Sequence, residues 1–232
     1  MISFPSQLEL GGRRIALGWA RVGEGTLASL SPGEQALMGP RVVRPRMQQF
    51  VAGRTAAAQA LASIGLRGEV LRTPASEKDA GRPYVSGIDA APLPPVAISL
   101  SHSGMLACAA VAEGRDPLGI DLEAAALEEA PSFLEEAFAP GELQGFGRFG
   151  NLGVDPVRAA WTLKEAVLKV WGVGLRVPLT RLQLQPTLPE PDGPWIACGV
   201  AVHYRGPNPP PPRMEARIGK AGGAVLSLAL PA

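Results

Sequence analysis

Apolar and polar residues follow short or helical periods along the first half of the chain and divide it into separate elements. Alternation over residues 13–22 predicts a strand. A Ser-Pro-Gly-Glu capping box predicts a helix over 30–38, and apolar residues at helical spacing predict a second helix over 47–65, which ends at a glycine. The apolar run over 96–125 is broken by His-Ser-Gly and Glu-Gly-Arg-Asp, so it predicts three short strands.

The second half begins with helices and ends with strands. Residues 131–146 predict one or two short helices, and 155–172 carries the strongest helical pattern in the chain, with Asp155 as N-cap and Pro156 in the first turn. The remaining apolar runs predict β-strands over 181–188, 194–204, 213–219 and 224–230. This order predicts an α+β fold in which helices pack against antiparallel sheets, with a division near residue 116 into two comparable halves.

Composition narrows the classes of function. The chain has 22 basic and 21 acidic residues and a net charge of +1, which argues against an electrostatic grip on nucleic acid or an anionic membrane. Cys108 and Cys198 each lie in an apolar run without zinc-ligand spacing, so we expect buried, reduced thiols. Since the first residues lack a signal-peptide pattern and no apolar run reaches the roughly 20 residues that span a bilayer, we expect a soluble cytoplasmic protein that binds neither nucleic acid nor membrane.

The sequence GIDLE, residues 119–123, contains the first candidate chemistry. In a strand, Asp121 and Glu123 project from one face while the two apolar residues between and before them project into the core. Converging carboxylate oxygens suit Mg²⁺, which typically takes one or two protein carboxylates. The alternative is a solvated strand edge.

The helix over 155–172 contains the second candidate chemistry. Its polar residues Arg158, Thr162, Glu165 and Lys169 follow one another along one face, and Lys164 lies beside that face. The Glu165–Lys169 pair has a plain interpretation as a surface i,i+4 ion pair worth about 0.2–0.5 kcal/mol. Alternatively, Glu165 is a third carboxylate for the same metal, and the two lysines bind a phosphate or diphosphate.

These two motifs resemble those of the 4′-phosphopantetheinyl transferases, specifically the longer two-domain class typified by the surfactin-synthetase-activating enzyme. That family combines a Gly-Ile/Val-Asp-x-Glu strand with a Phe/Trp-Ser/Thr-x-Lys-Glu-x-x-x-Lys helix, which GIDLE and WTLKEAVLK (161–169) match. SLSHS (99–103) and GRPY (81–84) are similar to two further family segments. The resemblance extends over about residues 30–175.

The resemblance implies both a fold and a reaction. The fold would be a pseudo-twofold pair of similar subdomains: residues 1–116 bind coenzyme A, residues 117–232 hold the metal site and the carrier-docking surface, and the active site lies between them in a monomer. The reaction would be Mg²⁺-dependent transfer of 4′-phosphopantetheine from coenzyme A to a serine of an apo acyl or peptidyl carrier protein, releasing 3′,5′-ADP. Two alternatives stay open: a non-catalytic coenzyme A binding module and a Mg²⁺-dependent phosphodiesterase.

The resemblance also implies roles for individual residues. Asp121, Glu123 and Glu165 would hold Mg²⁺. The catalytic residues would be Glu165 as base, Lys169 on the diphosphate at its leaving oxygen, and Asp121. The coenzyme A binding residues would be Arg54, Gly81, Arg82, Pro83, Ser101, His102, Lys164 and Lys169.

Two assignments stay open at this point. The arginine that meets the coenzyme A 3′-phosphate is one of Arg41, Arg44, Arg46 and Arg54. The aromatic residues of segment 133–146 belong either to a carrier-docking surface or to the core, because helically spaced aromatic residues occur in both.

Overall fold

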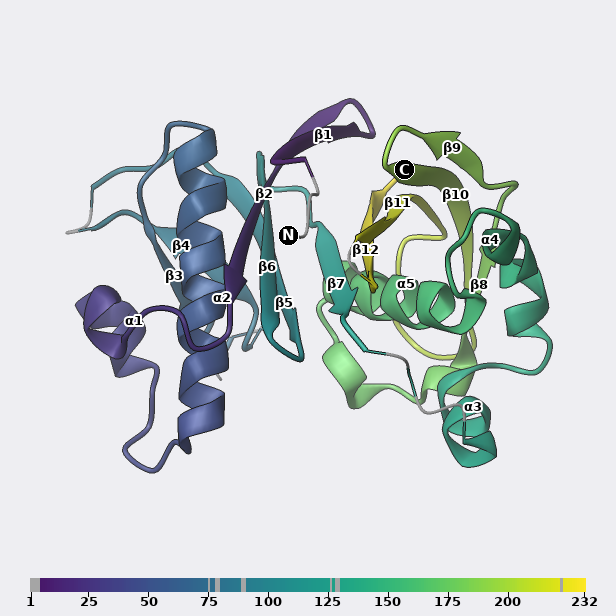
Figure 1. The fold of residues 1–232 in the computed structure, drawn as a ribbon, viewed down its shortest axis with the longest axis horizontal. Helices are drawn as coiled ribbons and strands as arrows, with labels where there is room; N and C mark the ends of the chain where they lie inside the picture. The colour runs from purple at the N-terminus through teal and green to yellow at the C-terminus, as the bar shows by residue number, and fades with distance from the viewer. Residues whose placement is uncertain are drawn as a thin grey trace. The chain divides into compact units, whose positions relative to one another are not determined.

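The computed structural model describes residues 5–74, 76–77, 80–88, 91–125, 127, 130–221 and 223–232. The chain divides into two compact units, which we call the N-terminal unit (Pro5–Leu118) and the C-terminal unit (from Gly119 to Ala232). Each unit contains an antiparallel sheet and a long helix packed against it, so the predicted α+β class is confirmed (Figure 1). Among the described residues, no helix is long and apolar enough to cross a membrane.

The N-terminal unit is built on a four-stranded antiparallel sheet in the order β1-β2-β6-β5. Its strands are β1 (Gln7–Leu10), β2 (Arg13–Arg21), β5 (Val96–Ser103) and β6 (Leu106–Glu113). A separate two-stranded sheet pairs β3 (Glu69–Arg72) with β4 (Pro83–Ser86). The predicted strand over 13–22 is β2, and the first two of the three predicted short strands are β5 and β6.

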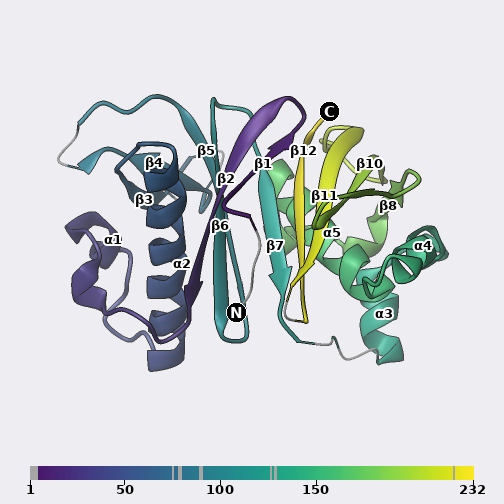
Figure 2. The ribbon, with the colours of Figure 1, turned by 45° about the horizontal axis from the view of Figure 1, so that its top comes forward.

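The helices of the N-terminal unit follow β2. They are the 3₁₀ turn η1 (Leu27–Ser29), α1 (Pro32–Ala36) and α2 (Arg44–Ser63). The predicted capping box is present, because Ser31 and Glu34 each accept a backbone hydrogen bond from the other. Helix α2 runs alongside β2 and β6 (Figure 2) and buries alanines such as Ala56 and Ala60, whose small side chains let the helix approach the sheet closely.

The C-terminal unit has a six-stranded sheet in the order β7-β12-β11-β10-β8, with β9 paired to β10. Its strands are β7 (Gly119–Glu123), β8 (Leu182–Pro186), β9 (Glu190–Asp192), β10 (Trp195–Tyr204), β11 (Arg213–Ala221) and β12 (Ala224–Pro231). Its helical elements are α3 (Pro131–Ala137), η3 (Glu142–Phe146), α4 (Gly147–Asn151), α5 (Pro156–Trp171), η4 (Gly174–Arg176) and η5 (Leu179–Arg181). The predicted strands over the last quarter of the chain are therefore confirmed.

Helix α5 begins and ends where the sequence predicts. The Asp155 carboxylate accepts a hydrogen bond from the backbone N–H of Arg158 at 2.7 Å, as an N-cap does. Gly172 adopts the left-handed conformation (φ 81°) that closes the helix. Between these ends, residues such as Leu163 and Val167 are fully buried against the sheet.

Both units bring their long helix very close to the strand that precedes it. A Cβ atom on Gly18 of β2 would collide with the backbone oxygen of Ala56 in α2, and one on Gly119 of β7 would collide with the backbone oxygen of Ala166 in α5. In each unit this strand pairs with the last strand of the same unit, β2 with β6 and β7 with β12. The two units thus share a strand–helix arrangement, while the pseudo-twofold relation stays a prediction.

The two cysteines are free and buried, as predicted. Cys108 lies in β6, and Cys198 lies in β10. Burial raises the pKa of the Cys198 thiol to about 12, with a small opposing effect of Arg217. This thiol is therefore protonated at neutral pH and unreactive.

The close approach at Gly119 predicts that Gly119→Ala destabilises the protein. Because the new methyl group meets backbone and not a flexible side chain, α5 or β7 must shift, and we expect a loss of about 1–3 kcal/mol in the free energy of unfolding, measured by urea titration. Gly147→Ala is the matched control, since its Cβ would meet no atom within 4 Å and its φ is −54°. Equal stability of the two variants would contradict the close approach.

Candidate functional site

Strand β7 places the predicted carboxylates at the start of the C-terminal unit. Ile120 and Leu122 are buried in the core, 0% and 1% exposed, and Asp121 is 6% exposed. The Asp121 carboxylate is thus not the freely solvated group that the strand-edge alternative required. Glu123, at the end of β7, is partly buried and accepts a hydrogen bond from the indole N–H of Trp161 at 3.2 Å.

Helix α5 exposes only a narrow stripe over its second half. Between residues 161 and 170, every side chain is buried except Trp161, Glu165 and Lys169, which are partly exposed and stand four residues apart. The predicted polar face through Thr162 needs correction, because Thr162 is fully buried and its hydroxyl lies 2.6 Å from that of Ser227 in β12. A hydroxyl can be buried here because Ser227 and the helix backbone satisfy it.

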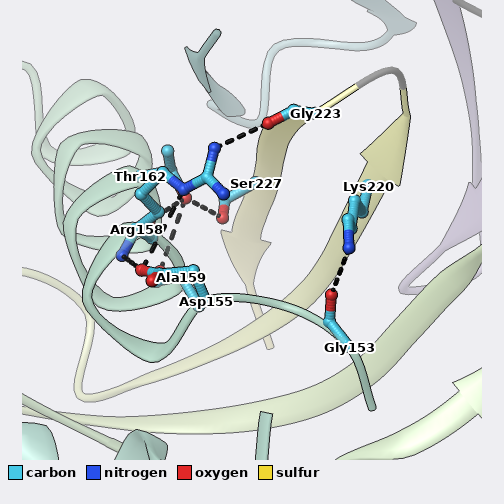
Figure 3. A network of polar contacts seen from close by, with 8 residues as sticks. All are labelled: Gly153, Asp155, Arg158, Ala159, Thr162, Lys220, Gly223 and Ser227. Atoms are coloured by element: carbon cyan, nitrogen blue, oxygen red, sulfur yellow. Dashed lines mark hydrogen bonds and ion pairs between the residues drawn. The ribbon is translucent and has the colours of Figure 1, made fainter. Parts of the chain in front are cut away.

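A network of polar contacts links the start of α5 to β11, to β12 and to Gly223 (Figure 3). Arg158 donates a hydrogen bond to the backbone oxygen of Gly223 at 2.6 Å, and its own backbone oxygen accepts one from Thr162 at 2.8 Å. Lys220 of β11 donates to the backbone oxygen of Gly153, just before the helix. Arg158 therefore acts as an anchor of α5.

Lys169 connects α5 to β7. Its ammonium group donates to the Asp121 carboxylate at 2.7 Å and to the backbone oxygen of Ile120 at 2.8 Å. The simple surface pair between Glu165 and Lys169 is therefore not what the structure shows. Lys169 instead supplies a positive charge at the point where the carboxylates of β7 and α5 meet.

Glu165 interacts electrostatically with Asp121, Lys169 and Glu123. Together, burial, Asp121 and Glu123 raise the pKa of Glu165 to about 7, with burial the largest cause and Lys169 opposing the rise. The three predicted carboxylates thus interact electrostatically although they come from two elements. A carboxyl group whose pKa is raised by burial and like charges is typical of functional sites.

The carboxylates suit a hard divalent cation by their chemistry, but no ligand set is assembled. Among the residues that the structure describes, no three His, Cys, Asp or Glu side chains are grouped so that they could hold a metal ion. Two carboxylate oxygens are instead hydrogen-bonded by Lys169 and Trp161. Metal binding by Asp121, Glu123 and Glu165 stays a prediction.

Lys164, which was predicted to bind phosphate, lies in the core of the C-terminal unit. Its side chain is 0% exposed, and its ammonium group donates to the Glu142 carboxylate at 2.7 Å and to the backbone oxygens of Ala137 at 2.8 Å and Leu179 at 3.3 Å. Burial lowers the pKa of Lys164 and Glu142 opposes that shift, so the pair holds the charge in place. Lys164 is thus a structural residue of the C-terminal unit, and its burial gives no support to the predicted role in phosphate binding.

Glu142 is the residue that sequence reasoning missed. Its carboxylate also accepts hydrogen bonds from the backbone N–H groups of Ala139 at 2.8 Å and Leu184 at 2.9 Å. The sequence contained a signal, because Glu142 is the one charged residue in the largely apolar segment FAPGELQGF. In the structure it is 2% exposed, and a buried carboxylate needs partners. The sequence could not indicate which partner it has.

The aromatic residues of segment 133–146 divide between surface and core. Phe138 and Phe146 are 4% and 0% exposed, so both belong to the core. Phe133 is partly exposed and packs edge-on against Trp161, with ring centroids 5.2 Å apart. Of these aromatic residues, only Phe133 is still a candidate for a docking surface.

In the N-terminal unit, His102, which was predicted to bind coenzyme A, lies beside an arginine. His102 is exposed near the end of β5, and its Nε2 lies 3.1 Å from the Nη1 atom of Arg46 in α2. A guanidinium group only donates, so Nε2 accepts and the ring proton is on Nδ1. Among the four arginines left open, Arg46 is thus the one that lies against a predicted binding residue.

Arg54 lies deeper in the same unit. It is 6% exposed, its Nε atom is 3.8 Å from the Glu34 carboxylate, and its guanidinium lies over the ring of Phe50. Within the described residues, its Nε and Nη2 atoms make no hydrogen bond. Burial, with a smaller effect of Arg72, lowers the pKa of Arg54 to about 10, against the effect of Glu34. Donors left in this state favour an anionic acceptor.

The remaining predicted binding residues lie in a turn and a strand of the N-terminal unit. Gly81 has φ 81°, and Arg82 and Pro83 follow it into β4. The backbone of Thr73 binds both sides of this turn, accepting from Gly81 and donating to Arg82, each at 2.9 Å. Ser101 precedes His102 in β5 and is partly buried.

Comparison with known proteins identifies one family. Residues 117–197, about a third of the chain, match the family model described as the 4′-phosphopantetheinyl transferase superfamily. The match runs from β7 through α5 into β10 and so contains every carboxylate of the candidate site. No curated protein matches the chain.

The raised pKa of Glu165 predicts an unusual pH dependence of stability in EDTA-treated protein. The folded protein holds a proton on Glu165 up to about pH 7, whereas the unfolded chain releases it near 4.5. The free energy of unfolding should therefore fall as the pH rises through this window, by at most about 1.4 kcal/mol per pH unit from this group. Urea titrations at several pH values measure it.

Glu165→Gln is the matched variant for this prediction. It keeps the size of the side chain and removes the titration, so its stability should fall less steeply between pH 4.5 and 7. The same slope in both proteins would show that Glu165 does not titrate in this range.

Proposed function

We propose that this protein, whose residues 117–197 belong to the 4′-phosphopantetheinyl transferase superfamily, transfers 4′-phosphopantetheine from coenzyme A to a serine of an apo carrier protein. Members of that superfamily use coenzyme A as substrate. In the transfer, the serine oxygen bonds to the phosphorus next to pantetheine, the bond from that phosphorus to the bridging oxygen breaks, and 3′,5′-ADP leaves. The single observation that carries the proposal is the hydrogen bond from Lys169 of α5 to Asp121 of β7, with Glu165 within electrostatic reach of both residues and of Glu123.

Glu165 is the proposed general base. In the metal-free protein its pKa of about 7 lies near neutrality, and a bound cation would favour the ionised form that can take a proton. The proton of the serine hydroxyl would move to a carboxylate oxygen of Glu165, directly or through a water. Its partial exposure on α5 makes it accessible to a substrate group.

Asp121, Glu123 and Glu165 are the proposed Mg²⁺ ligands. When bound, Mg²⁺ would neutralise charge on the diphosphate of coenzyme A, as phosphoryl transfer requires. The pKa of Glu165 is raised first by burial and then by repulsion from Asp121 and Glu123, and this repulsion supports the proposal because a cation would relieve it.

Lys169 is the proposed ligand of the coenzyme A diphosphate, at the oxygen that leaves with 3′,5′-ADP. Its side chain is 27% exposed and its ammonium group bonds to Asp121, so it can exchange one oxygen anion for another without crossing the core. A charge-assisted hydrogen bond to the departing phosphate oxygen would stabilise the charge that develops there.

The N-terminal unit is proposed to bind the nucleotide end of coenzyme A. The residues assigned are Arg54, Gly81, Arg82, Pro83, Ser101 and His102, to which the structure adds Arg46 through its contact with His102. The two buried donors of Arg54 support a role with the 3′-phosphate. Cooperation of both units on one substrate, in a monomer of the two-domain class, belongs to this proposal.

Intact-mass measurement of an apo acyl carrier protein tests the proposal. After incubation with this protein, coenzyme A and Mg²⁺, we expect the carrier to gain one phosphopantetheine, and EDTA should prevent the gain. Glu165→Gln should lower the rate by a factor of about 100 or more, since a general base contributes about 10²–10⁴-fold. A melting temperature no lower than that of the wild type would show that the fold is preserved.

The alternative functions are distinct outcomes of the same experiment. Binding of coenzyme A without a mass gain on fatty-acid, polyketide and peptidyl carriers would indicate a binding module. Release of 3′,5′-ADP without any carrier would indicate a phosphodiesterase. Normal turnover of Glu165→Gln would exclude Glu165 as base and as ligand.

A further inference from the structure

The buried contact between Lys164 and Glu142 joins α5 to four other segments. Lys164 reaches the end of α3 through Ala137 and reaches η5 through Leu179. Glu142 begins η3, and its carboxylate reaches β8 through the N–H of Leu184. Both side chains are 0% exposed, so this contact is removed from solvent.

The contact bears on the direction of the next side chain along α5. Consecutive residues of an α-helix are turned by about 100°, so fixing Lys164 on one side fixes where Glu165 points. The neighbours of Glu165 at positions 164, 166 and 168 are all buried, and the accessible stripe is one residue wide. A small rotation of α5 about its axis would therefore move the Glu165 carboxylate away from Asp121.

Stability alone gives a weak reason for a buried ion pair. Removing two charges from water costs free energy that their attraction often only offsets, and apolar residues of similar volume commonly stabilise a fold as well. The feature that apolar residues lack is direction: the ammonium group has three donors, and here it meets three acceptors from three segments. Such a contact permits one rotation of the helix.

We propose that the Lys164–Glu142 contact is a positioning device that sets the rotation of α5, and with it the place of Glu165 beside the β7 carboxylates. Neither residue touches substrate in this proposal. It rests on the proposed function, in which Glu165 is base and metal ligand, and it assigns to Lys164 a role different from phosphate binding.

Three variants and a control test the proposal. Lys164→Met and Glu142→Gln each remove one charge, and the double variant removes both and so leaves no unpaired buried charge that could prevent folding. Val167→Ala is the control, because it removes buried packing from the same helix without removing a polar contact. For each protein, kcat, the KM for coenzyme A and the melting temperature are measured on the folded fraction.

We expect the double variant to have a kcat at least about tenfold below that of the wild type, with a KM for coenzyme A within about twofold, because a shift of about 1 Å in a reacting group can cost about 100-fold. Val167→Ala should keep its kcat even if its melting temperature falls equally. A double variant with normal kcat, or a control that loses as much kcat, would overturn the proposal and leave the contact a purely structural one.

A crystal structure of the double variant separates this proposal from the proposed function. Displacement of the Glu165 carboxylate relative to Asp121 by about 1 Å or more, compared with the wild-type crystal structure, would support positioning even if the wild type transfers nothing to any carrier. An unmoved Glu165 would overturn it, even if the wild type is an active transferase.

Discussion

The candidate site depends on how closely α5 lies against β7. Gly119 allows this approach, because any side chain there would meet the backbone of Ala166. The carboxylates two and four residues farther along the strand then lie within electrostatic reach of Glu165. The same arrangement at Gly18 brings α2 against β2 in the N-terminal unit, so each unit uses a glycine to seat its main helix. A residue that carries no chemistry thus determines whether the chemistry can be assembled.

The C-terminal unit contains two groups of charged residues: the Lys164–Glu142 pair, in which the charges are equal in number, and the group around Glu165, in which negative charges outnumber positive ones. The side chains of Lys164 and Glu142 are fully buried. The Lys164 ammonium group and both Glu142 carboxylate oxygens have hydrogen-bond partners, as buried charges require. At the second group, the three carboxylates of Asp121, Glu123 and Glu165 face a single lysine, and the first two add to the burial that raises the pKa of Glu165. A fold gains nothing from such repulsion. An imbalance of this kind is expected where a cation or a substrate completes the site, which is why the second group, and not the better-made first one, carries the functional proposal.

Periodicity and capping predicted the elements that carry the site, because these are local properties. Asp155 and Gly172 limit α5, and alternation in β7 separates Asp121 from Ile120. The direction of Lys164 was not predictable in the same way, because its partner Glu142 lies 22 residues earlier and the pair forms only when α3, η5 and β8 pack together. The short strands β1, β3, β4 and β9 were not predicted, since three or four residues are too few to show a period.

Net charge concealed a separation of charge that matters for the proposed substrate. Residues 35–68 contain five arginines and no acidic residue, and α2 carries Arg44, Arg46 and Arg54 within this stretch. The carboxylates of β7 and α5 form the opposite kind of site. Coenzyme A combines a 3′-phosphate, which direct cationic contacts suit, with a diphosphate, whose charge a divalent cation held by carboxylates would neutralise during phosphoryl transfer. A chain with net charge +1 can present cationic contacts for one group and carboxylates for the other if these charges lie on different elements. Here the arginines lie on α2 and the acidic residues on β7.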